Sequence, residues 1–222
     1  MTKKIKSILV TQNDYIIHDV TDEEVDIHGH PGHYTEYNME GRPVREIKYD
    51  RHGHFEEMHL YAYDDRGFLI SDSLFPEEGQ EAEKVNFEYD DSGLLTKSHK
   101  KYLDGSMDTT VYYYDENHKP VKKVTTSDDE EPEEVVFEEE GENGATGAIE
   151  EPDNRDVRTT RNEKGLVILE EVYSDDNELL TRVERKYNEE GQPLESEVYI
   201  DGQGQAISRH YILHYDYTYF EE

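Results

Sequence analysis

The side chains best suited to chemistry are histidines near the N-terminus. His28, His30 and His33 lie within six residues, and His52 and His54 follow about twenty residues on. Alternate residues of a strand face the same side, so His28 and His30 could share a metal with His52 or His54 if their strands pair. The segment is also rich in Gly and Pro, which is typical of surface turns. We favour the turn interpretation, and we expect no metal and no cofactor.

Acidic pairs are the second candidate chemistry. Asp64 precedes Asp65, and Asp90 precedes Asp91. Carboxylates are the oxygen ligands that Ca²⁺ prefers, but these pairs lack the dense alternating spacing of a calcium loop. The first Asp of each pair can instead accept a hydrogen bond from a backbone N–H further along a turn. We therefore expect solvated turn carboxylates.

No catalytic motif is present. The chain lacks a Gly-x-Ser-x-Gly elbow, a His-Glu-x-x-His pair and a Gly-x-x-x-x-Gly-Lys phosphate loop. Pairs of carboxylates do not indicate a glycoside hydrolase here. With 55 acidic residues, some pair will have the separation of the two catalytic carboxylates of such an enzyme on any fold. The sequence therefore predicts a protein that is not an enzyme.

Charge and composition limit the partners. The 222 residues carry 55 acidic and 23 basic side chains, for a formal net charge of −32. Basic residues occur in small groups such as Lys97, Lys100 and Lys101, so we expect no direct nucleic-acid binding. There is no cysteine for a disulfide or a thiolate site. No apolar run is long enough for a signal peptide or a membrane helix, so we expect a cytoplasmic protein without membrane contact.

A repeat organises the chain. A unit of an aromatic residue, Asp or Asn, two polar residues and Gly recurs, as in Tyr63 to Gly67 and Tyr89 to Gly93. Gly adopts the positive φ that a chain reversal needs, and Asn tolerates it. Steps of 12 to 14 residues between these reversals predict hairpins with a two-strand unit of about 26 residues. The expected reversals are at positions 41, 53, 67, 79, 93, 105, 118, 165, 177, 191 and 204.

The segments between reversals have the period of strands. Met58, Leu60 and Ala62 share one face, and His59, Tyr61 and Tyr63 share the other. No stretch combines helical spacing with helix caps. The sequence therefore predicts an all-β fold, an antiparallel β-meander of repeated hairpins in an open or partly rolled sheet. Five residues of the C-terminal segment fall on one face, and we expect this segment to close the sheet: Tyr211, Leu213, Tyr215, Tyr217 and Tyr219.

These units resemble the YD repeats of the RHS family, in which tyrosine-aspartate units form long antiparallel meanders that wrap into shells around toxin domains. The resemblance rests on residues 49–55, 63–69, 89–95 and 187–194, and it covers roughly residues 38–125 and 160–205. The chain is far shorter than such a shell. What the resemblance implies is a meander sheet.

We divide the chain into four regions. Residues 1–37 are N-terminal strands with the histidine-rich turn, and residues 38–126 are the first half of the repeats. Residues 127–156 are an acidic interruption in which Val135 to Phe137 could form one strand and residues 138–156 form a long loop. Residues 157–222 are the second half of the repeats with the tyrosine-rich strand.

The sequence predicts a non-catalytic acidic protein-binding module. Most concretely, we expect an immunity or antitoxin-like inhibitor that captures a basic protein, namely a cognate toxin such as a nuclease. The reason is that a negative potential speeds the encounter with a cationic partner. A structural or surface-associated YD-repeat scaffold is the alternative, and the oligomeric state is open. Tyrosine suits recognition surfaces, so the expected partner-binding residues lie on one face: Tyr61, Tyr63, Asp64, Asp90, Tyr112, Tyr114 and Asp115.

Overall fold

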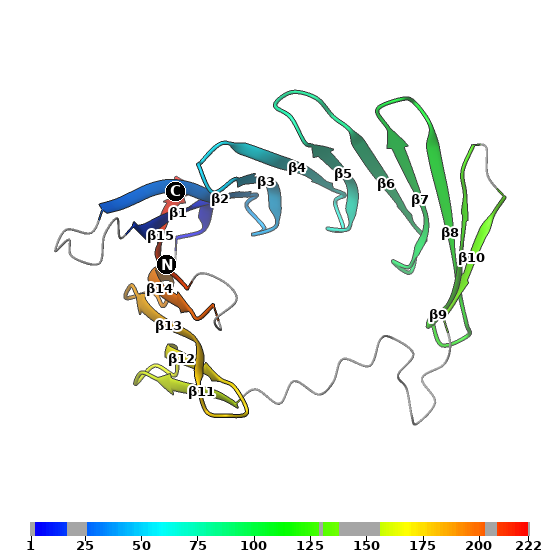
Figure 1. Ribbon diagram of the computed structural model, residues 1–222. Helices are drawn as coiled ribbons and strands as arrows, with labels where there is room; N and C mark the ends of the chain where they lie inside the picture. Colours follow the sequence, from blue (N-terminus) through cyan, green and yellow to red (C-terminus); the bar gives the residue numbers. More distant parts are fainter. Residues whose placement is uncertain (1–2, 17–25, 129–130, 138–155, 203–207, 222) are drawn as a thin grey trace. The chain divides into compact units, whose positions relative to one another are not determined.

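A computed structural model describes residues 3–16, 26–128, 131–137, 156–202 and 208–221 (Figure 1). These residues form strands and turns and contain no helix, as the sequence predicted. No segment among them forms a helix suited to crossing a membrane. The strands are β1 (Ile5–Ile16), β2 (Asp26–Tyr37), β3 (Pro43–Tyr49), β4 (Phe55–Tyr63), β5 (Leu69–Phe75), β6 (Glu83–Tyr89), β7 (Leu95–Tyr102), β8 (Met107–Tyr114), β9 (Pro120–Thr126), β10 (Glu133–Val136), β11 (Asp156–Arg161), β12 (Val167–Tyr173), β13 (Leu179–Tyr187), β14 (Pro193–Ile200) and β15 (Arg209–Tyr219).

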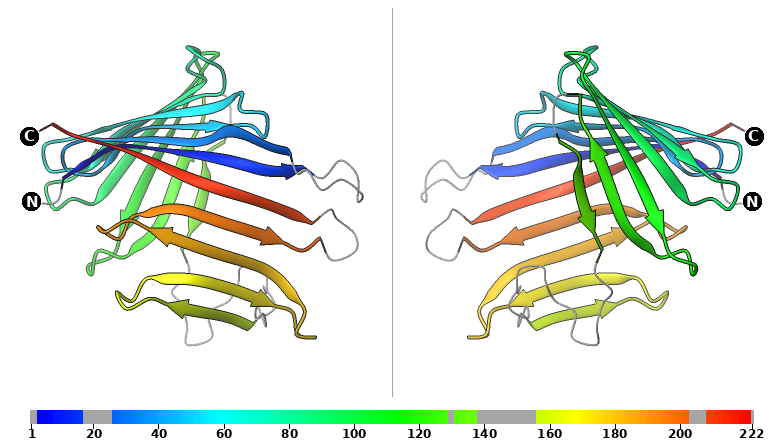
Figure 2. Two further views of the ribbon diagram at one scale, coloured as in Figure 1. Left: turned by 90° about the vertical axis from the view of Figure 1, so that its left-hand side faces the viewer. Right: turned by 90° about the vertical axis from the view of Figure 1, so that its right-hand side faces the viewer.

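The strands form one antiparallel meander that is not closed, in the order β10-β9-β8-β7-β6-β5-β4-β3-β2-β1-β15-β14-β13-β12-β11. The predicted fold class is confirmed. The tyrosine-rich segment does not close the sheet, however. It forms β15, which pairs with β1 on one side and with β14 on the other, as Figure 2 shows. The period-two pattern indicates which segments are strands, but it does not specify which strand the C-terminal one pairs with.

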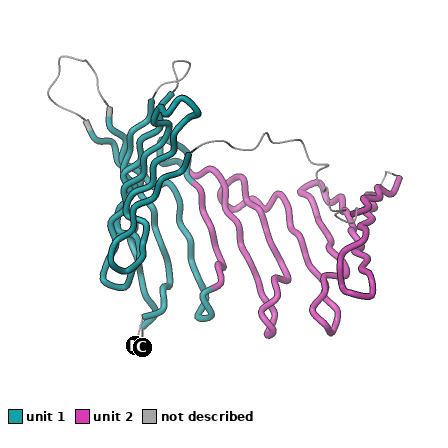
Figure 3. The backbone as a smooth tube through the Cα atoms, turned by 90° about the horizontal axis from the view of Figure 1, so that it is seen from below, with its two compact units in different colours: residues 1–41, 49–54, 149–222 teal, residues 42–48, 55–148 magenta. Residues whose placement is uncertain are grey.

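The chain divides into two compact units, coloured separately in Figure 3. Unit 1 comprises residues 1–41, 49–54 and 149–222, and unit 2 comprises residues 42–48 and 55–148. Within each unit, the described strands pack only against their neighbours in the sheet. Of the predicted acidic interruption, residues 129–130 and 138–155 lie outside the described residues, and β10 forms at Glu133–Val136.

The turns follow the predicted chemistry. In the β6–β7 turn, Gly93 has φ of 90° and its N–H donates to Asp90 O at 3.1 Å. His118 and Asn177 take the same left-handed conformation, with φ of 64° and 60°. Every expected reversal position within the described residues has positive φ, and position 204 lies outside them. The predicted hairpin spacing is therefore confirmed.

The sheet has almost no hydrophobic core. Among the described residues, Ile47 and Val198 are the only buried apolar side chains, each 7% exposed. A sheet normally buries one face against a second layer, but here small polar residues are buried within the single layer. Ser98 and Ser196 are examples, and their hydroxyls lie 3.5 Å and 3.3 Å from those of Tyr112 and Tyr215. Short side chains at these positions leave room for the large rings beside them.

Tyrosine hydroxyls tie neighbouring hairpins together. At five places in the described residues, a Tyr near the end of a strand donates to a backbone carbonyl about twenty residues upstream, at the start of the strand before it in the chain. Tyr89 Oη, for example, donates to Leu69 O at 3.0 Å, and burial raises the pKa of this phenol, so the hydroxyl keeps its proton. We call this contact the tyrosine clasp. It recurs at Tyr63 to Pro43 O, Tyr114 to Leu95 O and Tyr187 to Val167 O, and over a slightly longer separation at Tyr217 to Pro193 O.

Removing one clasp hydroxyl should destabilise the fold. Tyr89→Phe keeps the ring but leaves Leu69 O without its donor, so we expect the free energy of unfolding in urea to fall by about 1 kcal/mol. Tyr113→Phe is the matched control, because Tyr113 is 43% exposed and its hydroxyl bonds to none of the described residues. Equal stability of the two variants would contradict a structural role for the clasp.

Candidate functional site

The predicted partner-binding residues all lie in unit 2, on β4, on β8 and in the turns after β4, β6 and β8. These three turns share one edge, since every second strand of an antiparallel sheet runs in the same direction. Strand register places Tyr61, Tyr63, Tyr112 and Tyr114 on a common face. The structure therefore arranges these residues along one edge and one face of the unit, with four strand spacings, about 19 Å, between β4 and β8.

The first carboxylate of each turn is occupied by the turn itself. Asp90 Oδ1 accepts the N–H groups of Ser92 and Leu94, both at 2.9 Å, and the Ser92 hydroxyl at 2.7 Å. Asp115 Oδ1 accepts two loop N–H groups at 2.8 Å, from Asn117 and Lys119. The hydroxyl of Ser92, together with the loop N–H groups, holds the pKa of Asp90 below its usual value. These carboxylates act mainly as acceptors that stabilise the turns.

Asp64 is held in the same way. Its Oδ1 accepts the Phe68 N–H at 2.8 Å, and its Oδ2 pairs with Arg66 Nε at 3.0 Å. Desolvation favours the neutral acid, but these hydrogen bonds and the guanidinium outweigh it, and the pKa of Asp64 is lowered. Asp64 has a donor on each oxygen before any partner arrives.

The predicted tyrosines are also engaged within the fold. Tyr63 and Tyr114 form clasps at 2.8 Å, and Tyr61 Oη donates to Glu46 Oε2 at 2.8 Å. Burial, followed by this hydrogen bond to Glu46, raises the pKa of Tyr61. All four predicted tyrosines are half-buried, whereas Tyr113 on the opposite face is exposed. Their rings can still offer apolar area, but their hydroxyls belong mainly to the sheet.

The second acidic residue of each turn is free. Asp65, Asp91 and Glu116 are exposed, and their side chains bond to none of the described residues. We call these three residues the acidic row. Alternate strands place its members about 10 Å apart along the shared edge. The sequence prediction names the first acid of each turn and not the second. The N–H acceptance expected of the first position implies that the second faces the solvent.

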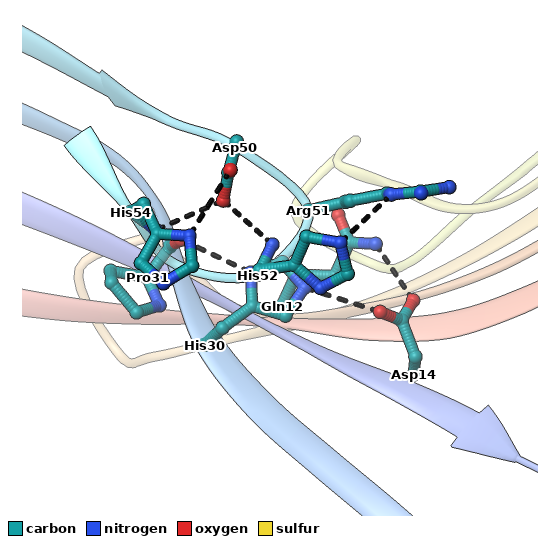
Figure 4. A network of polar contacts seen from close by, with 8 residues as sticks. All are labelled: Gln12, Asp14, His30, Pro31, Asp50, Arg51, His52 and His54. Carbon is teal, nitrogen blue, oxygen red and sulfur yellow. Dashed lines mark hydrogen bonds and ion pairs between the residues drawn. The ribbon is translucent and has the colours of Figure 1, made fainter. Parts of the chain in front are cut away.

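Two of the histidines near the N-terminus, His30 and His54, pair with carboxylates (Figure 4). His30 Nε2 lies 3.1 Å from Asp14 Oδ2, and His54 Nδ1 lies 3.3 Å from Asp50 Oδ2. Arg51 Nε donates to His52 Nε2 at 3.2 Å. Within the ranges that the structure describes, no three His, Asp or Glu side chains are placed to hold a metal ion.

The same network borders a hollow of about 610 Å3 in unit 1. Its lining residues are Asp14, His28, Gly29, His30, Arg51 and His52. The β3–β4 turn lies directly against β2 here, since a side chain at Gly53 would come within 3.1 Å of His30 and Pro31 atoms. The His30–Asp14 pair therefore joins β2 to β1, the His54–Asp50 pair lies within the β3–β4 turn, and the turn meets β2 by packing against His30 and Pro31.

Comparison with known proteins identifies no relative by sequence, since no family model and no curated protein matches. Among solved structures, the chain is similar to a porin-like protein from Bacteroides uniformis ATCC 8492, with 11% identity and a TM-score of 0.40, over 98% of this chain and 99% of that one. It is also similar to the structure titled TcdB2-TccC3-Cdc42, with 11% identity and a TM-score of 0.27, over 87% of this chain and 11% of that one. Likenesses this distant establish neither a family nor a function.

The occupied turn carboxylates predict loss of stability in acid. The lowered pKa of Asp90 means that its contribution is complete above the unfolded-state pKa of about 4 and is lost as the pH falls through the folded-state pKa. Asn188 accepts the Gln192 N–H at the equivalent position, so Asp90→Asn should retain the turn without titrating. We expect the urea midpoint of the wild type to fall more between pH 7 and pH 3 than that of Asp90→Asn. Parallel pH profiles would contradict this role of Asp90.

Proposed function

We propose that the protein is a non-catalytic binding protein that captures a basic protein. The observation that carries the proposal is the acidic row, in which Asp65, Asp91 and Glu116 have no donor among the described residues while Asp64, Asp90 and Asp115 are occupied. A free carboxylate on a rigid turn can accept an ion pair without first breaking a bond within the fold. The scaffold thus presents charges at a fixed spacing.

The charge of the whole chain supports the same partner chemistry. A formal net charge of −32 produces a negative potential that raises the rate of encounter with a cationic protein and disfavours acidic ones. Many of the cations in the chain already have carboxylate partners, such as Lys100 with Glu83 at 2.8 Å and Arg185 with Glu170 at 3.3 Å. The charged side chains of the described residues that remain without an opposite partner are therefore mostly acidic.

We further propose that the partner is a toxin and that the protein acts as an immunity or antitoxin-like inhibitor. The support is the resemblance of the turn units to YD repeats, because the RHS family is implicated in toxin delivery, together with the chemistry of the acidic row, which suits a cationic enzyme such as a nuclease. In this proposal the protein holds its partner and transforms no substrate.

Affinity capture from the native host tests the proposal. We expect the tagged full chain to retain one basic protein in a stoichiometric complex, and the complex to suppress that protein's activity. Recovery of the chain only as its own oligomer, or only at the cell surface, would favour the alternative of a structural YD-repeat scaffold.

The acidic row should control the rate of association with the captured protein. Asp65→Asn, Asp91→Asn and Glu116→Gln together remove three charges, and we expect the association rate constant at low salt to fall about tenfold. The matched control removes three exposed charges from the β12–β13 turn of unit 1, through Asp175→Asn, Asp176→Asn and Glu178→Gln. An equal decrease for the two triple variants would show that only total charge matters.

A further inference from the structure

β10 is a terminal strand of the sheet with one open edge. It pairs with β9 over four residues, from Glu133 opposite Thr125 to Val136 opposite Lys122. Among the described strands, none is hydrogen-bonded to its other side. An unpaired strand edge presents a row of N–H and C=O groups that another chain can pair with.

Hydrogen bonding beyond the end of β10 shows which backbone groups face the open edge. The Phe137 N–H donates inward to Val121 O at 2.9 Å. Successive residues of a strand direct their N–H and C=O groups to alternate sides, so Val135 faces β9 while Glu134 and Val136 face outward. The open edge therefore offers two donor and acceptor sets, at Glu134 and Val136.

The side chains at this edge are apolar and exposed. Val136 is 61% exposed, Phe137 39% and Val135 36%. Three consecutive exposed apolar residues at a sheet edge are unusual, because protruding edges are normally blunted by charge or by proline. They suit a partner strand that brings apolar side chains of its own.

The charges next to this edge select its partner. Glu133 and Glu134 are exposed, and Glu134 Oε2 lies 3.3 Å from Lys122 Nζ, which leaves Glu133 without a cation among the described residues. A second copy of this acidic strand would bring like charges together, which is destabilising across strands. The other terminal strand, β11, carries Arg158 and Arg161 together with Asp156, whose carboxylate pairs with Arg158 at 2.7 Å. β11 therefore has a net positive charge and β10 a net negative one, so a basic segment is matched better to β10.

We propose that the captured basic protein contributes an extended segment, with Lys or Arg alternating with β-branched apolar residues, that adds to the sheet beside β10. The inference rests on the proposed capture of a basic protein and identifies where part of it is held. Backbone hydrogen bonds to Glu134 and Val136 supply affinity, and alternate side chains contact the exposed valines and Glu133. The acidic row then attracts the basic protein, and the β10 edge holds it once it is bound.

Two peptides and two variants of the full chain test the β10 edge. The probe is an N-acetylated, C-amidated heptapeptide that alternates Lys and Val, and its control replaces the central Val with Pro at equal charge. We expect the control to bind at least about tenfold more weakly by fluorescence anisotropy, because Pro cannot donate to the edge and disrupts the strand. Binding of the alternating peptide should also slow hydrogen exchange at the Val136 amide.

Val136→Pro removes the outward N–H without taking a hydrogen bond from the β9 pairing. We expect this variant to bind the alternating peptide about tenfold more weakly than the wild type and to bind the Pro peptide as the wild type does. Val136→Ala is the matched control, because it keeps the N–H and should retain most of the affinity. Hydrogen-exchange protection of the Phe137 amide that matches the wild type shows that β9 and β10 still pair.

The outcomes separate this inference from the proposed function. If the wild type binds both peptides equally, and Val136→Pro binds them as the wild type does, binding is due to charge attraction alone. That result would overturn strand addition but not the capture of a basic protein. Absence of binding to either peptide also overturns the inference, whereas the proposed function then stands or falls by affinity capture from the host.

Discussion

The turn that reverses the chain is the constraint on which the structure depends. A residue at positive φ lets the chain fold back, and the Asp or Asn at the start of the turn accepts the loop N–H groups, as Asp90 does from Ser92 and Leu94. Because the sheet buries almost no apolar side chain, it cannot rely on a core to hold the strands in register. The turns perform that task locally along the sheet, and the tyrosine clasps perform it at five places in the described residues.

The same local chemistry explains how an acidic protein can use some carboxylates to stabilise its fold and leave others exposed for a partner. The occupied acids stabilise the turns as ions, so their charge contributes to the fold. The acids beside them, such as Asp91, have no such role and remain exposed on a turn that is held by hydrogen bonds. The function we propose follows from this division, because carboxylates on turns that are already hydrogen-bonded lose little further freedom when they contact a cationic surface.

The fold could be predicted largely from the sequence, because its determinants are local. Gly93, His118 and Asn177 lie at reversal positions that the repeat spacing alone predicts. The pairing of β15 with β1 could not be predicted, since it depends on contacts between the two ends of the chain. The roles within the candidate site also depended on three-dimensional contacts. Spacing identified Tyr63 and Asp64 as repeated residues, but only the geometry showed that Tyr63 reaches Pro43 O and that Asp64 is occupied by Phe68 and Arg66.

The most direct test of the central claim is the salt dependence of the rate constants for binding between the full chain and the basic protein that it captures. Electrostatic capture predicts that the association rate constant falls steadily from low to physiological salt while the dissociation rate constant changes little. An association rate constant that is the same across that range would contradict the account, because the acidic surface would then play no part in finding the partner.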